Sequence, residues 1–325
     1  MSLLKPPLWM QKIAFERCLA EIAARSGLRL PSGWRFFERS PLMKADHAAF
    51  LMREGKTGAA CAMTGAFGED GFLSTPFADD KAAADALLTE LIALQRRWGA
   101  RRVAAPVSPR LFDTDGGLAV GGLGEQASCF STDVLPFWDE LLQKHGFFIA
   151  GASSFYALDE ARFPAERYAR AARESIRRFG YRVVSARSMG LGAACSAMAR
   201  LAQKEPLLGM GGRAFYESLR ALGSAWSPET TAIALRGDEA IGYILTLCDR
   251  ERRILRAATA QVAQAWQRRG VTAALADLTV REGRGFRIEA GVIDDENFAS
   301  RWCVENAGGR RIMWMRRYKL EITNN

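Results

Sequence analysis

The sequence has little of what metal centres are built from. Only two histidines, His47 and His145, occur in the 325 residues, and the six cysteines are spread along the chain with no CxxC pair. Structural zinc sites need closely spaced Cys and His ligands, so the composition predicts that no metal is bound. Isolated cysteines of this kind are typical of small core residues in a reducing compartment.

Long apolar runs are also missing. No run of roughly 18 consecutive apolar residues occurs, which is about the length a transmembrane helix needs. The N-terminal segment lacks the uninterrupted apolar region of a secretory signal peptide. These absences predict a cytoplasmic protein with no membrane span, whose contact with any membrane would be peripheral.

What the sequence does contain is typical of a folded protein. Hydrophobic residues make up 49% of it and charged residues 25%, and at this length one hydrophobic core is near its growth limit, so we expect two domains. Lys and Arg number 45 against 36 Asp and Glu, which gives a net charge of +9. That excess is compatible with a polyanionic partner (nucleic acid, an acidic membrane or a phosphorylated cofactor) and equally with a basic solvated surface.

The pattern of apolar residues alternates between strand-like and helix-like periods in both halves. This order predicts an α/β protein, of the α+β type with a mixed sheet in each half. We expect one domain over residues 1–159, an Arg-rich linker helix over 160–180 and a second domain over 181–325. The Gly- and Ser-rich residues 111–133 are predicted to be a long loop, and 310–322 a final pair of strands.

An internal repeat supports this division. Gly146 is followed ten positions later by Tyr156, and Gly308 is followed by Tyr318 at the same spacing. Both copies come after a short amphipathic helical pattern. The repeat therefore favours a duplicated domain.

The sharpest local motif is the segment Gln267, Arg268, Arg269 and Gly270, between a predicted strand and a predicted helix. Exposed N–H groups at a helix start form a site for anions, and glycine lets the backbone approach a ligand closely. Two arginines would add charge-assisted hydrogen bonds to phosphate oxygens. The alternative is a basic turn that only begins the helix.

The order of motifs after this segment resembles the GNAT acyltransferase superfamily. In that superfamily a Q/R-x-x-G-x-G/A loop binds the pyrophosphate of acyl-CoA, and the next strand leads into an Asn-headed helix. The four residues above match the loop, Thr272 stands at its last small position, and Asn297 matches the Asn. The resemblance covers residues 181–322. Residues 77–87 lack the loop and hold three aspartates, which would repel a pyrophosphate, so the first half resembles a degenerate copy. The whole chain is similar to bacterial tandem-GNAT proteins.

The resemblance implies acetyl-CoA or another acyl-CoA as cosubstrate and a small-molecule or peptide amine as acceptor. It implies that a strand edge holds the thioester and pantetheine and that the loop binds the phosphates; these residues are Ala260, Gln261, Val262, Gln267, Arg268, Arg269, Gly270, Val271, Thr272 and Asn297. Glu289, alone among apolar residues, is our candidate for the base that deprotonates the amine. The alternative interpretation is that Glu289 is a strand carboxylate paired with an arginine. Val304 stands where many members carry a Tyr as general acid.

Three functions stay open at this point. The first is an acyl-CoA-dependent N-acyltransferase. The second is a tRNA-dependent aminoacyl transferase of similar tandem fold, for which the arginines of 160–180 could follow a phosphate backbone, although such a helix is more often a solvated face. The third is a non-catalytic acyl-CoA-binding module. Nucleic acid is thus a possible but not a favoured partner.

Overall fold

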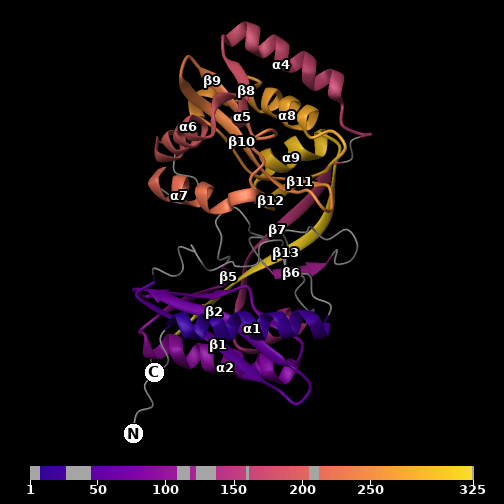
Figure 1. Ribbon diagram of the computed structural model, residues 1–325. Helices are drawn as coiled ribbons and strands as arrows, with labels where there is room; N and C mark the ends of the chain where they lie inside the picture. Colours follow the sequence, from indigo (N-terminus) through magenta and orange to yellow (C-terminus); the bar gives the residue numbers. More distant parts are fainter. Residues whose placement is uncertain are drawn as a thin grey trace. The chain divides into compact units, whose positions relative to one another are not determined.

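The computed structural model describes residues 8–26, 45–107, 118–121, 137–158, 161–204 and 212–323. By its internal contacts the chain forms two compact units. The first comprises Met1–Ser154, Asp294–Glu296 and Ile312–Asn325, and the second comprises Phe155–Ile293 and Asn297–Arg311. Each has its own set of strands and its own core (Figure 1).

The first unit is built around a mixed sheet with the strand order β1-β2-β3-β5-β13. Strands β3 and β5 are parallel, and the other neighbours are antiparallel. Its elements are α1 (Leu8–Ser26), β1 (His47–Glu54), β2 (Ala59–Phe67), β3 (Asp70–Ser74), β4 (Phe77–Ala78), α2 (Lys81–Arg97), β5 (Arg102–Val107), β6 (Leu118–Gly121), α3 (Phe137–Lys144) and the start of β7 (Phe148–Leu158).

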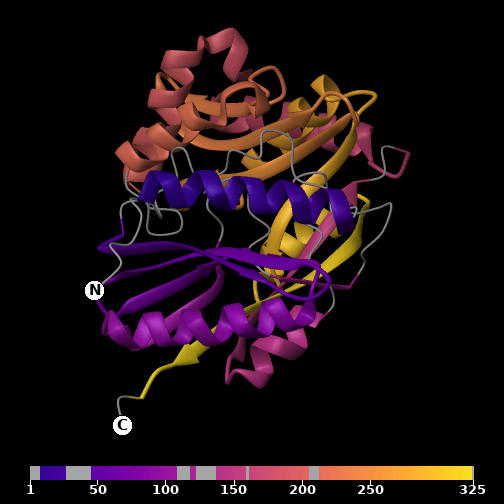
Figure 2. The same cartoon turned by 60° about the horizontal axis from the view of Figure 1, so that its bottom comes forward.

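Helices α1 and α2 cover opposite faces of this sheet (Figure 2). Strand β2 shows why both faces are apolar. Its residues Ala60 and Ala62 belong to the core under α2, while Cys61 and Met63 belong to the core under α1. Because successive side chains of a strand point to opposite faces, a continuous apolar run such as β2 needs a cover on each side.

The second unit has the sheet order β8-β9-β10-β11-β12, with β7 next to β12. Strands β11 and β12 are parallel; β8, β9, β10 and β11 pair antiparallel in succession. Its elements are α4 (Ala165–Phe179), β8 (Arg182–Ser185), α5 (Ala186–Met189), α6 (Leu191–Lys204), α7 (Gly212–Leu222), the 3-10 turn η3 (Gly223–Ala225), β9 (Ala232–Arg236), β10 (Glu239–Asp249), β11 (Ile254–Val262), the 3-10 turn η4 (Gln264–Trp266), α8 (Val271–Glu282), β12 (Arg287–Asp294), α9 (Phe298–Asn306) and the start of β13 (Gly309–Glu321).

Helix α8 packs on one face of this second sheet, and α4 lies beside α8 (Figure 1). Ile244 of β10 belongs to the core under α8. Its neighbour Tyr243 points to the other face, where the ring of Phe215 from α7 packs edge-on against it at 5.7 Å between centroids. The two faces of β10 are thus covered by different helices.

The last strand of the chain belongs mainly to the first unit. Residues Ile312–Glu321 of β13 lie in that unit, and Tyr318 pairs with Ala105 of β5. Conversely, Phe155–Leu158 at the end of β7 belong to the second unit. Each unit therefore contains a strand segment from the half of the sequence that forms most of the other unit.

Two local predictions are wrong. Residues 310–322 do not form a pair of strands, because Gly309–Glu321 is one continuous strand of 13 residues. Within the predicted loop 111–133 the structure has the strand Leu118–Gly121, which pairs with β13; the remaining residues of that loop lie outside the described part of the chain. In the described residues, no helix is both long and apolar enough to cross a membrane.

Candidate functional site

The loop between β11 and α8 leaves the start of a helix without a side-chain cap. The cap position of α8 is Gly270, which has the left-handed φ of 76° and offers no side-chain hydrogen bond. The first N–H groups of a helix have no partner within the helix and carry the positive end of its dipole. An uncapped helix start of this kind is what an anion site needs, and that an anion binds here stays a prediction.

The loop side chains differ in what holds them. Gln267 donates from its Nε2 to the carbonyl oxygen of Val262 at 3.4 Å, which ties the loop to the end of β11. The guanidinium carbon of Arg269 lies 5.2 Å from the ring centroid of Trp266 and 5.6 Å from that of Phe179. Arg268 is exposed, has a φ of 59°, and forms no ion pair or hydrogen bond within the described part of the chain. Both arginines are exposed, and Arg269 differs from Arg268 in that its guanidinium lies near two aromatic rings.

Helix α4 fixes the position of the loop from the other side. A Cβ atom added to Gly270 would lie 2.6 Å from the Cβ atom of Ser175 in α4. The Ser175 hydroxyl is itself buried and hydrogen-bonded to the hydroxyl of Tyr181 at 2.6 Å. Glycine at position 270 is thus required twice, by its backbone conformation and by the close approach of α4.

The corresponding helix start in the first unit is closed by a carboxylate. Asp80 caps α2 by accepting from Ala83 N at 2.8 Å, and it also accepts from the Thr57 hydroxyl at 2.6 Å. These bonds, that from Thr57 above all, lower the pKa of Asp80 to about 2. The fixed negative charge of Asp80 disfavours an anionic ligand at this helix start.

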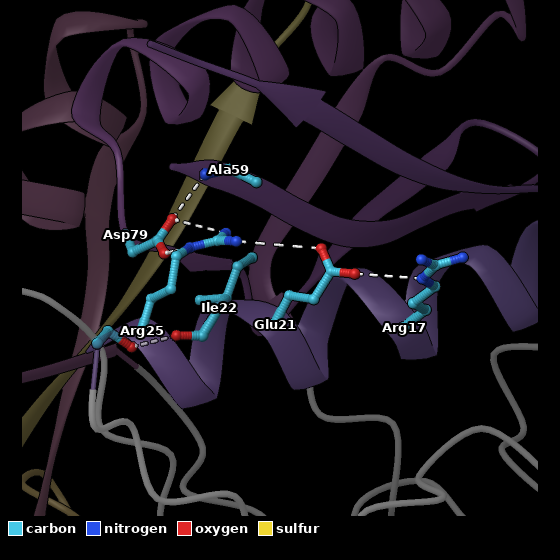
Figure 3. A network of polar contacts seen from close by, with 7 residues as sticks. Arg17, Glu21, Ile22, Arg25, Ala59 and Asp79 are labelled. Atoms are coloured by element: carbon cyan, nitrogen blue, oxygen red, sulfur yellow. Dashed lines mark hydrogen bonds and ion pairs between the residues drawn. The ribbon is translucent and has the colours of Figure 1, made fainter. Parts of the chain in front are cut away.

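Asp79, the residue before this cap, is also engaged. Its carboxylate accepts from Arg25 Nε at 2.6 Å and from Ala59 N at 2.6 Å, as Figure 3 shows. Arg25 lies on α1, where Glu21 is a second ionic partner at 4.0 Å. The two aspartates of this loop therefore hold the first unit together, in agreement with the prediction that this copy is degenerate.

Strands β11 and β12 separate in the second unit. Their pairing runs from Ile254 and Arg287 to Ala257 and Ala290, and the described residues beyond show no further pairs between the two strands. At the same point β11 has a bulge, because Ala258 has no partner on β10 while Ala257 pairs with Thr246 and Thr259 with Leu245. Ala260, Gln261 and Val262 follow this point, paired on the β10 side alone. Backbone groups on their other edge have no partner on β12 among the described residues.

Gln261 is held from the neighbouring strand. The hydroxyl of Tyr243, opposite it on β10, donates to Gln261 Oε1 at 3.2 Å. Burial raises the pKa of Tyr243 far above its ordinary value, so this hydroxyl keeps its proton at neutral pH. Tyr243 therefore holds the side chain of Gln261.

Glu289 lies one residue before the point of separation and is fully buried. One carboxylate oxygen, Oε1, accepts a charged hydrogen bond from Arg287, while Oε2 has no hydrogen-bond partner among the described residues. Glu289 is level with Arg256 of β11, which is also buried and lies with its guanidinium carbon 4.5 Å from the ring centroid of Phe155. Both interpretations of Glu289 thus have a structural basis: the ion pair with an arginine exists, and one oxygen remains to accept a proton.

Helix α9 begins at the same edge of the sheet as α8, because both follow parallel strands. The side chain of Asn297 caps α9 by accepting from Ser300 N at 3.1 Å. Val304 packs inward against Tyr156, Ala290 and Ile293. An apolar residue at this position fills the core beneath α9, which is a physical reason for the missing tyrosine.

The structure therefore groups the predicted residues in two places. The strand edge and the loop are continuous, from Ala260 to Thr272; Val271 has its side chain in the core and contributes its backbone, while Thr272 is exposed in the first turn of α8. Glu289 lies farther back, level with Arg256. Sequence reasoning missed the bulge at Ala258, which has no residue-type signature. It considered an arginine partner for Glu289 but did not identify Arg287.

Comparison with known proteins identifies the fold. No protein-family model matches the sequence, and no curated protein matches it. The structure is similar to a tandem GNAT protein from the clavulanic acid biosynthesis pathway, with a TM-score of 0.60 at 10% identity, covering 99% of this chain and 98% of that one. It is also similar to a GCN5-related N-acetyltransferase from Sphaerobacter thermophilus, with a TM-score of 0.55 at 16% identity over 98% and 95% of the two chains.

A third similar structure is the GCN5-related glucosamine N-acetyltransferase region of a fungal multi-domain β-N-acetylglucosaminidase. The TM-score is 0.59 at 12% identity, and the match covers 94% of this chain and 37% of that one. At such identities the likeness shows the fold. The chain has a mixed α/β architecture of two GNAT-like units, as predicted from its sequence.

Proposed function

We propose that this protein is an acyl-CoA-dependent N-acyltransferase that transfers an acetyl or longer acyl group directly to an amine, with acyl-CoA held by the second unit. The observation that carries the proposal is the contrast between the two equivalent helix starts. The α8 start has a glycine cap and the free cation Arg268, whereas the α2 start is closed by the carboxylate of Asp80. Only the former suits a pyrophosphate.

In this proposal the loop binds the phosphates and the separated strand binds the acyl end. N–H groups at the start of α8 and the guanidinium of Arg268 would hold the pyrophosphate, with Arg269 beside them and Asn297 at the head of the neighbouring helix. Backbone N–H groups of β11, in the stretch from the bulge at Ala258 to Val262, would polarise the thioester carbonyl. Such fixed dipoles, aimed at an oxygen on which charge develops, are the largest contribution in most acyl transfers.

The amine must lose a proton before it attacks. We propose Glu289 as the group that takes it, through its Oε2 atom. Because the carboxylate is fully buried, the proton would pass through an intervening water. Arg287 would keep the carboxylate in place. The acceptor is assigned as a small-molecule or peptide amine, and the protein is proposed to act in the cytoplasm of a bacterium.

The test is calorimetric titration of CoA and acetyl-CoA into the wild-type protein and into a variant with Arg268→Ala and Arg269→Ala. Each lost charge-assisted hydrogen bond should weaken binding by roughly 1.5 to 3 kcal/mol. The matched control is Arg96→Ala with Arg97→Ala, at the end of α2 in the first unit, which should leave affinity unchanged. An unchanged affinity in the loop variant would remove this loop from the site.

Thermal unfolding with bulk tRNA in place of CoA separates this proposal from a tRNA-dependent transferase. A ligand at 100 times its dissociation constant stabilises the folded state by about 2.7 kcal/mol, which shifts the unfolding midpoint measurably. A shift with tRNA and none with any CoA ester would replace the proposed donor.

A further inference from the structure

The second unit has a cavity at the end of its sheet where β12 begins. The cavity has a volume of about 410 Å³. Three arginines line it, each from a different segment: Arg162 precedes α4, Arg287 begins β12, and Arg310 begins β13. Binding pockets for small molecules typically begin at about 300 Å³, so the space is sufficient for a metabolite.

The charge around this cavity is positive. No carboxylate is among its lining residues, in the part of the chain that the structure describes. A fourth arginine, Arg253, lies at the rim, because a Cβ atom added to Gly285 would be 2.6 Å from its Nη2 atom. Gly285 has a φ of 79°, a backbone conformation that residues other than glycine adopt only with strain. Glycine therefore allows the loop to pass close to Arg253.

One of the three arginines is held by a buried group. The side chain of Arg287 is 34% exposed and is ion-paired with Glu289, whose side chain is 0% exposed. An arginine fixed in this way loses less side-chain entropy when it binds an anion than a free surface arginine does. The cavity therefore has one prepositioned cation and two exposed ones.

This cavity is separate from the loop proposed to bind acyl-CoA. Arg287 is level with Ile254 at the first residue of β11, whereas the Gln267–Gly270 loop follows the last residue, Val262. The eight residue steps from Ile254 to Val262, at about 3.3 Å each, put roughly 26 Å between the two ends. A ligand in the cavity would not contact the phosphate loop.

We propose that this cavity is a second ligand site, which binds a small phosphate-bearing anion. Three arginines that line one space match the charge of a phosphate, with whose oxygens arginine forms paired hydrogen bonds. The volume leaves room for a small organic group attached to the phosphate. The site is separate from the proposed phosphate loop, and it shares Arg287 with the ion pair that holds Glu289.

The experiment measures thermal unfolding and calorimetric binding with inorganic phosphate and with glycerol 3-phosphate, at constant ionic strength maintained with chloride. The test variant combines Arg162→Ala and Arg310→Ala, two exposed side chains whose removal should leave the fold intact. Its dissociation constant for the probe should rise at least tenfold. Arg284→Ala, an exposed arginine of the same loop that does not line the cavity, is the matched control and should bind like the wild type.

A second variant keeps this result distinct from phosphate binding at α8. In Arg268→Ala with Arg269→Ala, the phosphate-dependent shift should persist. If the shift is lost in that variant and kept in the Arg162 and Arg310 variant, phosphate binds the α8 loop and the proposal is wrong. Absence of any shift in the wild-type protein with both probes also overturns it. Neither result depends on whether the protein is an acyltransferase.

Discussion

Tyr318 and Asp139 are 179 residues apart in the sequence and are joined by a hydrogen bond that Tyr318 donates. The repeat partner of this tyrosine forms the same kind of bond: Tyr156 donates to Glu305 Oε1 at 3.1 Å. In each case a strand from one half of the sequence is bonded to a helix from the other half, α3 or α9. The two tyrosines therefore fasten the exchanged strands β13 and β7 at equivalent places.

Tyr318→Phe tests the hydrogen bond between Tyr318 and Asp139. Burial raises the pKa of Tyr318 far above its ordinary value of about 10, and the bond to Asp139 raises it further. A raised pKa in the folded state means that the contribution to stability is complete below about pH 10 and is lost as the pH rises above it. At pH 7 the variant should be less stable by roughly 0.5 to 1.5 kcal/mol in urea unfolding.

The difference between variant and wild type should shrink above about pH 10, where the unfolded chain loses its phenolic proton more readily than the folded chain does. Tyr216→Phe removes a partly exposed phenol of α7 and serves as the control, with little effect at either pH. A constant difference for Tyr318→Phe across this range would show that the hydrogen bond is not coupled to the titration.

The exchange of strands marks the limit of what the sequence predicts about the fold. Local patterns are sufficient for the elements, since the apolar period of Leu87, Leu88 and Leu91 identifies α2 and the repeat identifies a duplication. The pairing of β13 with β5 has no local signal. Tyr318 stands in an apolar alternation that suits either sheet, so the choice depends on long-range contacts that a pattern does not encode.

Gly270→Ala tests the close approach of α4 and α8. The substitution places a Cβ atom 2.6 Å from that of Ser175 and introduces a side chain at a φ of 76°. Gly237→Ala is the matched control, because Gly237 has a similar φ of 58° but no atom within 4 Å of an added Cβ. Chemical denaturation should show the Gly270 variant to be less stable than the control by about 1 to 3 kcal/mol.

Calorimetry on the same pair should show weaker CoA binding for Gly270→Ala alone, because α8 must move away from α4 to make room. If the two variants unfold at the same denaturant concentration, the neighbouring helix gives way freely and strain at the left-handed position is the whole effect.

Asp80→Ala tests the closed helix start of the first unit. Because the pKa of Asp80 is lowered to about 2, its contribution to stability is present above the unfolded value of about 3.9 and is lost as the pH falls through about 2. Loss of a helix cap should cost roughly 0.5 to 2 kcal/mol at pH 7. The deficit, followed by urea unfolding, should diminish between about pH 4 and pH 2.

CoA affinity should be unchanged in Asp80→Ala, because this loop does not take part in the proposed site. Asp80→Asn keeps an oxygen acceptor for Ala83 and Thr57, so it should retain part of the stability but not its dependence on acid. Two CoA molecules bound per chain in Asp80→Ala would mean that the carboxylate alone had excluded the second.

For the candidate site, too, local sequence predicts some features and not others. Gln267 to Gly270 could be proposed from the sequence because a helix start that binds phosphate needs glycine and cations in a short segment. The bulge at Ala258 could not be predicted from the sequence, since a bulge depends on how two strands pair and alanine has no preference for it. The ion pair between Arg287 and Glu289 joins residues two apart on one strand, a spacing that the sequence displays but that does not reveal burial.

Glu289→Gln is the prediction that decides between a base and an ion-pair partner. Glutamine keeps the shape and one acceptor oxygen for Arg287 but has no basicity, so kcat should fall by roughly 10² to 10⁴ at neutral pH while CoA affinity changes little. Higher pH should restore part of the rate, since more of the amine then arrives deprotonated. Arg287→Ala, assayed alongside, breaks the same ion pair yet leaves the carboxylate. If both variants lose thermal stability and CoA binding together, Glu289 is structural; a wild-type rate in Glu289→Gln at every pH would assign the proton to solvent.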